Sequence, residues 1–362
     1  MADAADVEAF LRHLGGDDDT VAGLLANAVA GGPLPGRVVR AERIAAEVAT
    51  PEGVFLAGWD EPVCTGDWVL ARPDPGADGP PRSGIAGRIT WLAPRHSAFV
   101  RRSADSDQPQ VLAANIDEIW IVVAADEPLS PARLERTLVL AWDSGAQPVA
   151  VLTKTDRVEH AALDAVAAVL EQVGPGIPAV AVSSVTGDGL ALLSERLGPG
   201  RSAALLGRSG AGKSTLVNAL AGTAVAVGEV RARDGKGRHT TNWRELVVVP
   251  GGGALIDTPG LRGVGLWIDE GGLAAAFSDI TELAASCRFS DCAHTTEPGC
   301  AVRAAIQAGA LDPARLARYR ALSQEAAETE DRNQARVDAR AQRAAAGRRA
   351  RIRANDRRRT GD

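Results

Sequence analysis

One stretch decides the fold: Gly207-Arg208-Ser209-Gly210-Ala211-Gly212-Lys213-Ser214-Thr215, which follows the apolar run 203–206 and reads G-x-x-x-x-G-K-S. A strand that leads through a glycine-rich turn into a helix is typical of a phosphate-binding loop. The glycines let backbone N–H groups surround a polyphosphate, Lys213 reaches the outer phosphates and Ser214 can ligate Mg²⁺. The sequence therefore predicts nucleotide binding here, and the alternative is a chance glycine-rich turn.

Short apolar segments surround this loop in the chain, and we expect them to be strands. Strands that are apolar along their whole length are buried on both faces, which is typical of a mostly parallel sheet covered by helices. The sequence therefore predicts an α/β domain over residues 110–270, with its ligand loops at the carboxyl ends of the strands. The expected strands are residues 119–123, 149–152, 179–182, 203–206, 246–249 and 254–256.

A magnesium ligand is expected at the end of the last of these strands. Asp257-Thr258-Pro259-Gly260 follows residues 254–256 and has the form of the D-x-x-G motif of GTPases. Asp257 would hold Mg²⁺ through water, and the N–H of Gly260 would meet the γ-phosphate. By itself this tetrapeptide is an ordinary turn; it becomes specific because it shares a sheet edge with the phosphate loop.

The polar, glycine-rich stretch 234–241 lies between these two motifs and is suited to a switch segment. Thr240 or Thr241 would complete the Mg²⁺ shell when the γ-phosphate is present. Leu261 follows the D-T-P-G motif, where many GTPases have the glutamine that orients water. His239 is therefore the candidate for positioning water, although a lone loop histidine is more often simply exposed.

Base recognition is predicted for two loops that precede the phosphate loop. Thr153-Lys154-Thr155-Asp156 is similar to the guanine motif N-K-x-D. Asp156 can accept both the N1–H and the N2–H of guanine, which adenine does not offer, and the stem of Lys154 would pack over the base. Thr153 replaces the usual asparagine, so an amide expected to help fix base and loop is lost. Guanine preference is expected to survive through Asp156 but in weakened form.

The second base loop, Ser183-Ser184-Val185-Thr186-Gly187, follows the strand 179–182. It resembles the loop of GTPases in which a backbone N–H meets guanine O6. Taken alone it is an ordinary Ser/Gly turn, so its assignment depends on its place beside the T-K-T-D loop.

Two further modules flank the α/β domain. Residues 1–35 contain short helical patterns and are expected to be an N-terminal extension, and residues 36–105 alternate β-rich segments with Gly/Pro/Asp turns, which predicts a five-stranded barrel of the oligonucleotide-binding type. The barrel carries basic and aromatic residues suited to RNA, although tryptophans in so small a barrel are more often core. They are Arg37, Arg40, Arg88, Arg95, Arg101, Arg102, Trp59, Trp68 and Trp91.

A metal site is predicted after the α/β domain. The spacing Cys287-x₄-Cys292-x-His294-x₅-Cys300 supplies three thiolates and an imidazole, enough for a closed tetrahedral site with one structural Zn²⁺. The alternative, free cysteines in a core, does not explain their clustering among polar residues. We expect a mostly helical zinc-binding domain over residues 271–345 and an arginine-rich tail over residues 346–362.

Composition narrows the classes of function. The formal charge is −6, yet residues 332–362 carry eleven Arg against three Asp, which leaves −14 for the remainder. Such a basic end indicates a polyanionic partner or a solvated tail. No apolar stretch approaches the roughly 18 residues of a membrane span, and the acidic N-terminus does not resemble a signal peptide. We expect a cytoplasmic protein without a membrane partner.

The order of the motifs is the most informative observation. In an ordinary GTPase the base loops follow D-x-x-G, whereas here T-K-T-D and S-S-V-T-G precede the phosphate loop, as in a circular permutation. With the barrel in front and the Cys/His segment behind, residues 36–320 resemble the ribosome small-subunit-dependent GTPase A family (RsgA, also called YjeQ). Local phrases agree, namely Ala113-Ala114-Asn115-Ile116-Asp117, Gly237-Arg238-His239-Thr240-Thr241, Asp291-Cys292-Ala293-His294 and Pro298-Gly299-Cys300.

The resemblance implies hydrolysis of GTP to GDP and phosphate, stimulated by the small ribosomal subunit and acting late in its maturation. It also implies that the barrel and the zinc domain both contact ribosomal RNA, and we expect a monomer. Two rival functions remain open at this point. One is a GTP-gated RNA-binding scaffold with incidental hydrolysis, which is compatible with Leu261 because intrinsic turnover should be low without the usual glutamine. The other is an ATP-using P-loop enzyme, and Asp156, which suits guanine, argues against it.

Overall fold

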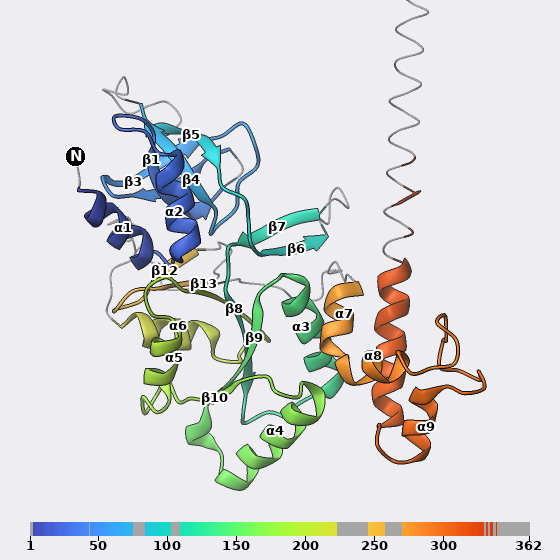
Figure 1. Cartoon of the computed structure of the whole chain (residues 1–362). Helices are drawn as coiled ribbons and strands as arrows, with labels where there is room; N and C mark the ends of the chain where they lie inside the picture. Colours follow the sequence, from blue (N-terminus) through green and yellow to red (C-terminus); the bar gives the residue numbers. More distant parts are fainter. Residues whose placement is uncertain are drawn as a thin grey trace, which may run out of the picture. The chain divides into compact units, whose positions relative to one another are not determined.

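The structure is a computed structural model of the whole chain (Figure 1). It describes residues 3–42, 44–74, 84–102, 109–222, 245–257 and 270–328, together with positions 331, 334, 335 and 338. The chain divides into two compact units, Met1–Leu266 and Trp267–Asp362. In the described ranges, no helix is both long enough and apolar enough to cross a membrane.

A closed barrel lies near the start of the first unit. Its strands follow the order β1-β2-β3-β5-β4, and β3 runs parallel to β5, which is the arrangement of an oligonucleotide-binding fold. The predicted five-stranded barrel is therefore confirmed. The strands are β1 (Leu34–Ala41), β2 (Ala46–Thr50), β3 (Gly53–Gly58), β4 (Trp68–Pro73) and β5 (Gly87–Leu92).

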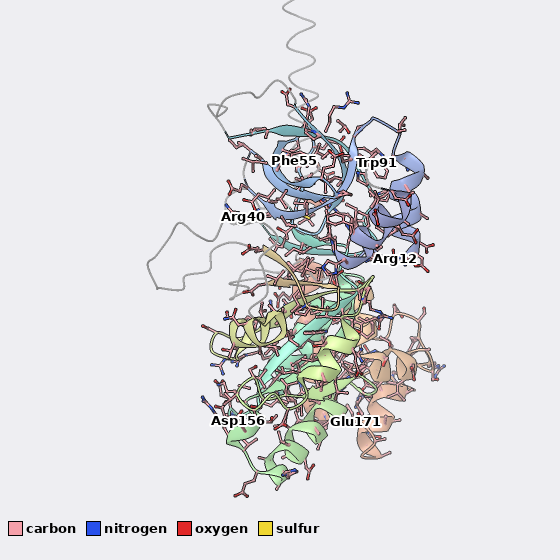
Figure 2. All side chains as sticks on the ribbon, turned by 90° about the vertical axis from the view of Figure 1, so that its left-hand side faces the viewer. Arg12, Arg40, Phe55, Trp91, Asp156 and Glu171 are labelled. Carbon is pink, nitrogen blue, oxygen red and sulfur yellow. The ribbon has the colours of Figure 1, made fainter. Side chains whose placement is uncertain are left out.

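The barrel tryptophans follow the core interpretation rather than the RNA one. Trp68 is 1% exposed, and Trp59 packs against the barrel core formed by residues such as Val38 and Val48. Trp91, labelled in Figure 2, is half-buried. Four of the arginines named above as RNA candidates already hold protein partners: Arg37 is buried, and the pairs are Arg40–Glu42, Arg88–Asp60 and Arg95–Asp67.

Two helices, α1 (Ala4–His13) and α2 (Asp18–Asn27), precede the barrel. The Asp17 carboxylate accepts a hydrogen bond from the Thr20 N–H at 2.8 Å and caps α2, which is why the chain turns there. The predicted extension is therefore helical, and it contacts the barrel strands β1 and β4.

The second part of the unit is a six-stranded sheet of order β10-β9-β8-β11-β13-β12. All neighbours are parallel except β12, which runs antiparallel to β13 at the edge. This confirms the predicted mostly parallel sheet. The strands are β8 (Glu118–Ala124), β9 (Gln147–Thr153), β10 (Ala179–Ala181), β11 (Ser202–Gly207), β12 (Glu245–Val248) and β13 (Ala254–Asp257).

Helices cover both faces of this sheet (Figure 1). The helices α5 (Leu190–Arg196) and α6 (Lys213–Ala221) pack on one face, where Leu193 and Leu216 join the strand residues Trp120 and Val122 in one core cluster. The helices α3 (Pro131–Asp143) and α4 (His160–Val173) contact each other. A short helical turn, η1 (Thr155–Arg157), follows β9.

A two-stranded hairpin that the sequence did not predict lies between barrel and sheet. It consists of β6 (Ala98–Arg102) and β7 (Pro109–Ala114), which pair antiparallel. Thr65, before β4, forms a bridge with Ala113. The phrase 113–117 therefore leads from the barrel region directly into the first strand of the sheet.

The second unit is helical, as predicted. Its elements are α7 (Glu270–Ala276), α8 (Ser278–Ala284), α9 (Ala301–Gln307) and a helix over residues 313–328. Phe277 is fully buried and meets Tyr319 edge to face, with ring centroids 5.4 Å apart. Arg315, 3% exposed, pairs with Asp279 at 2.6 Å, so the core of this unit includes a shielded ion pair.

Candidate nucleotide site and metal centre

The predicted phosphate loop forms the turn between β11 and α6. Gly210 and Gly212 adopt φ values of 82° and 93°, in the left-handed region that favours glycine. The Lys213 ammonium donates to the carbonyls of Gly207 at 2.7 Å and Arg208 at 2.8 Å. Lys213 therefore lies across the loop at the carboxyl end of a central strand, where ligands bind in sheets of this kind.

Thr153 lies at the end of β9 and joins the base-reading loop to the phosphate loop. Its side-chain hydroxyl is 2.6 Å from the carbonyl oxygen of Ala211 and 3.3 Å from that of Val123. Thr153 is 2% exposed, so this hydrogen bond is shielded from water. The loop was expected to lose a side-chain attachment because asparagine is replaced. The Thr153 hydroxyl instead makes such an attachment, to the phosphate loop.

The two base loops also meet. The Ser183 hydroxyl donates to the Asp156 carboxylate at 2.6 Å and accepts from the backbone N–H groups of Val185 and Thr186. Ser183 is fully buried, whereas Ser184 is half-buried. The carboxylate of Asp156 is thereby oriented by the neighbouring loop, at the end of the sheet far from the barrel (Figure 2).

Lys154 has a left-handed backbone, with φ of 60°. Its ammonium lies 3.0 Å from Asp126 Oδ1, in the loop that follows β8. The sequence reasoning missed Asp126 and its neighbour Glu127. The available signal was their position directly after a buried strand, at the same edge as the motifs.

Asp257 ends β13, where it is in register with Leu205 of β11. Burial raises the pKa of the Asp257 carboxyl above its ordinary value, while the positive charge of Lys213 acts to lower it. Ser214 is exposed on the first turn of α6. A hydroxyl and a carboxylate at one strand edge fit the oxygen ligands that Mg²⁺ prefers. His239, Thr240, Thr241 and Gly260 lie outside the described residues.

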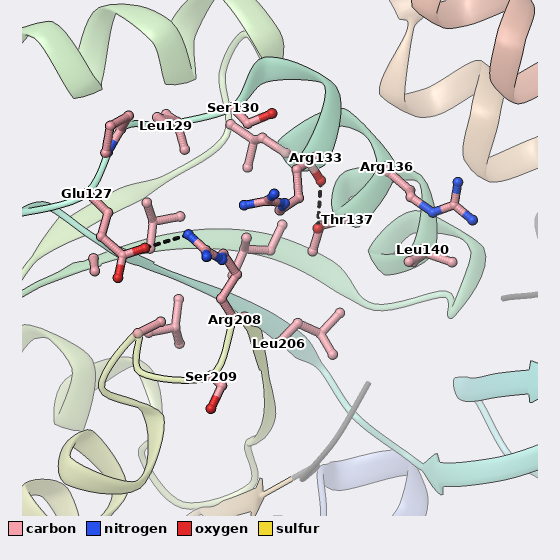
Figure 3. Close-up of a pocket in the computed structure, with 18 of the residues that line it drawn as sticks. Glu127, Leu129, Ser130, Arg133, Arg136, Thr137, Leu140, Leu206, Arg208 and Ser209 are labelled. Atoms are coloured by element: carbon pink, nitrogen blue, oxygen red, sulfur yellow. Dashed lines mark hydrogen bonds and ion pairs between the residues drawn. The ribbon is translucent and has the colours of Figure 1, made fainter. Parts of the chain in front are cut away.

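A cavity of about 740 Å³ lies beside the phosphate loop (Figure 3). It is bounded by β8, β11 and α3, with Leu206 and Leu140 among its apolar residues and Arg133 and Arg136 on α3. The Arg208 guanidinium of the phosphate loop donates to Glu127 at 2.6 Å within this region.

The four predicted zinc ligands come together in the second unit. The ligand atoms of Cys287, Cys292, His294 and Cys300 lie within 4.8 Å of one another. His294 Nδ1 is 3.6 Å from Cys287 Sγ and 3.4 Å from Cys300 Sγ. Three thiols and one imidazole at such distances fit a closed tetrahedral zinc site.

A phosphate loop and two base loops at one sheet edge, with the base loops earlier in the chain, define a circularly permuted P-loop GTPase. The sequence model of the family described as RsgA GTPase matches residues 92–267. A relative from Streptomyces coelicolor, "Small ribosomal subunit biogenesis GTPase RsgA", is 48% identical over 337 residues, which cover 90% of this chain and 88% of the relative. The chain belongs to the RsgA GTPase family and is a GTP-hydrolysing enzyme.

Solved structures have the same fold. YjeQ from Thermotoga maritima is 26% identical, with a TM-score of 0.60 over 81% of this chain and 98% of that chain. YloQ, described as a circularly permuted GTPase, is 24% identical, with a TM-score of 0.58 over 83% of this chain and 96% of that chain. The likeness to YloQ shows the fold alone.

Proposed function

We propose that this chain hydrolyses GTP in the cytoplasm during biogenesis of the small ribosomal subunit, late in its maturation, and that the subunit stimulates turnover. The extent of the likeness supports this, since the Streptomyces coelicolor relative that carries this name matches along 88% of its length. We further propose that the protein acts as a monomer and contacts the ribosomal RNA of the subunit.

The observation that carries the nucleotide assignment is the 2.6 Å hydrogen bond between Thr153 and Ala211, because it joins the base-reading and phosphate loops into one site. Lys213 and residues 207–215 would bind the phosphates. Mg²⁺ would be held by Ser214 and Asp257. The guanine base would be bound by Lys154, Asp156, Ser183 and Ser184, with Thr153 orienting the loop.

Three roles rest on the sequence alone. His239 would position the attacking water, Thr240 or Thr241 would complete the Mg²⁺ shell, and the Gly260 N–H would meet the γ-phosphate. These residues lie outside the described part of the chain, so their roles are proposals drawn from the motif order. When bound, Mg²⁺ would neutralise charge on the β- and γ-phosphates.

We also propose that the chain consists of five segments. They are a helical extension over residues 1–35, an RNA-facing barrel over 36–105, the GTPase domain over 110–270, a zinc-binding domain over 271–345 and an arginine-rich tail over 346–362. Because Arg37 is buried and Arg40, Arg88 and Arg95 are ion-paired, RNA contact through these arginines would require exchange of ion pairs such as Arg88–Asp60.

Turnover measured with increasing amounts of small ribosomal subunits tests the function. Slow hydrolysis by the free protein should rise strongly with added subunits. Turnover that stays constant through a full titration would contradict the stimulation. Single-turnover rates on and off the subunit separate an enzyme from a GTP-gated scaffold, since a scaffold shows nucleotide-dependent binding with the same slow rate in both states.

Base preference is tested by competition. ATP should fail to displace GTP at concentrations that saturate an ATP enzyme, because adenine lacks the two N–H groups that Asp156 accepts. Displacement of GTP by equimolar ATP would contradict the guanine assignment.

Metal analysis of the purified protein tests the zinc proposal. One equivalent of zinc is expected in the wild type, and it should be lost in Cys292→Ser. Cys64→Ser is the matched control, because Cys64 is a buried cysteine of the first unit, outside the cluster. A metal-free wild type, or full zinc retention in Cys292→Ser, would reject the site.

A further inference from the structure

Two acidic residues that belong to none of the sequence motifs lie between the base-reading loop and the phosphate loop. Asp126 and Glu127 follow β8 after a single intervening residue, Ala125. In the sheet, β8 has β9 on one side and β11 on the other. The carboxyl end of β8 therefore lies between the loop that carries Lys154 and the loop that carries Arg208.

Asp126 holds the base-reading loop on both sides of Asp156. The Lys154 ammonium donates to its two carboxylate oxygens at 3.0 and 3.3 Å, and the Arg157 guanidinium donates at 3.2 Å. The side chains of Asp126 and Lys154 are 23% and 21% exposed. The hydrogen bond from Lys154 is the main reason why the pKa of Asp126 lies below its ordinary value.

Glu127 makes the corresponding contact to the phosphate loop. Its Oε2 accepts from Arg208 Nη1 at 2.6 Å, and its Oε1 lies 4.0 Å from the Lys154 ammonium. Figure 3 shows the two side chains facing each other across the edge of the cavity. Neighbouring carboxylates thus each hold a cation, one on each loop.

Thr153 explains why such contacts are needed. An asparagine amide has two N–H donors, whereas a threonine hydroxyl has one, and here that hydroxyl bonds to Ala211. No second side-chain donor of Thr153 remains to hold the rest of the loop or the base. The ion pairs of Asp126 supply an additional attachment two residues before and one residue after the Asp156 position.

We propose that Asp126 and Glu127 are positioning residues of the nucleotide site, Asp126 for the base-reading loop and Glu127 for the phosphate loop. This inference rests on the proposed assignment of residues 153–156 to guanine and residues 207–215 to phosphate. Since each carboxylate acts on a different loop, their effects on nucleotide binding are separable.

Asp126→Asn is the first test. It keeps the size of the side chain but removes the charge that holds Lys154 and Arg157, so GDP affinity should fall about 5- to 10-fold. The preference for GDP over inosine diphosphate, which lacks the 2-amino group, should fall as well, because Asp156 is less well oriented. Asp126→Glu should restore part of the preference.

Asp60→Asn is the matched control, since it breaks the exposed Asp60–Arg88 pair of the barrel. An unchanged GDP preference in Asp126→Asn, or the same loss in Asp60→Asn, would overturn the role of Asp126. A purely structural role would lower the melting temperature and leave the ratio of GDP to inosine diphosphate affinity unmoved, which would also overturn it.

Glu127→Gln is the second test. It weakens the attachment of Arg208, so GDP and inosine diphosphate should both bind about 2- to 4-fold more weakly, with their ratio unchanged. An altered ratio, or an unchanged affinity for both, would overturn the separation of roles.

The two proposals fail in distinguishable ways. If the wild type does not bind GDP, or if Lys213→Ala binds it as tightly as the wild type, the nucleotide site itself is wrong. If the wild type binds GDP, Lys213→Ala does not, and Asp126→Asn behaves as the wild type, only the positioning role is wrong.

Discussion

The two ends of strand β11 show opposite uses of polar groups. At the amino end, Ser202 is 1% exposed, and its hydroxyl contacts the Asn115 carbonyl, Asp117 and the buried guanidinium of Arg37. At the carboxyl end, the Arg208 side chain is 56% exposed and the Lys213 ammonium donates to the loop carbonyls of Gly207 and Arg208. Buried, saturated groups hold the parts of the unit together, whereas accessible groups can exchange their partners for a ligand.

Arg37 is the centre of the amino-end network. Its guanidinium donates to the carbonyls of Leu14, Gly66 and Asn115, and stacks 4.6 Å from the Trp68 ring centroid. It thus links the helical extension, the barrel and the segment 115–117 that leads into the sheet. Burial lowers its pKa to about 10, which leaves it charged at neutral pH.

Breaking this network should have the largest effect. Arg37→Met removes a hydrogen-bond donor from each of three buried carbonyls, those of Leu14, Gly66 and Asn115, so the free energy of unfolding should fall by about 3–5 kcal/mol. Urea denaturation measures it. Arg88→Met, which removes an exposed ion pair, should leave stability nearly unchanged. Equal stability of Arg37→Met and wild type would show that the buried network does not hold the unit together.

Lys213→Ala tests the carboxyl end. Loss of the ammonium should weaken GTP binding about 10- to 160-fold, since hydrogen bonds to charged groups contribute about 1.5–3 kcal/mol. Stability should change little, because the groups that Lys213 touches are accessible to water. Fluorescence titration with a labelled guanine nucleotide and a thermal melt measure the two effects. Affinity within ~3-fold of the wild type would contradict the phosphate-loop assignment.

Thr153→Val sharpens the comparison, because Thr153 is buried like the amino-end groups yet lies at the carboxyl end. The valine has nearly the same shape and leaves the Ala211 carbonyl without its donor, so GDP affinity should fall about 5- to 10-fold. Thr153→Ser keeps the hydroxyl and should bind within ~2-fold of the wild type. Equilibrium binding of GDP to the three proteins measures this. Equal affinity of the valine and serine variants would mean that the hydroxyl does not order the loops.

The smallest expected effect is the pH dependence of the folded protein's stability. Lys154 lowers the pKa of Asp126 in the folded protein, so the stabilisation from this contact is present above the ordinary value of 3.8 and is lost as pH falls below it. Lys154, Arg157 and Glu127 are the charged groups that face or adjoin this carboxylate.

Melting temperatures of wild type and Asp126→Asn should therefore differ by a constant amount between about pH 5 and 7 and converge below about pH 4. A difference that grows on acidification would have the wrong sign and would contradict the assignment of this contact.

Much of the fold could be predicted from local patterns. An apolar run such as 203–206 that is followed by glycines and a lysine commonly folds into a strand and a phosphate-binding loop. The Cys/His spacing is typical of a tetrahedral metal site. The hairpin β6–β7 was missed, because residues 98–102 and 109–114 pair across positions 105–110, where a boundary between barrel and sheet was expected. The pair Asp126–Glu127 was missed because its meaning depends on cations more than 25 positions away in the chain, Lys154 lying 28 positions on.

By itself, the sequence determined the phosphate-loop motif, the permuted order of the motifs, the Cys/His cluster and the apolar strands, because each depends on residue types at short spacing. Only the tertiary structure decided which distant groups meet. Arg37 and Ser202 are 165 positions apart, and Thr153 and Ala211 are 58 apart. Such contacts depend on which strands become neighbours, and that is set by how the whole sheet and barrel bury their apolar faces.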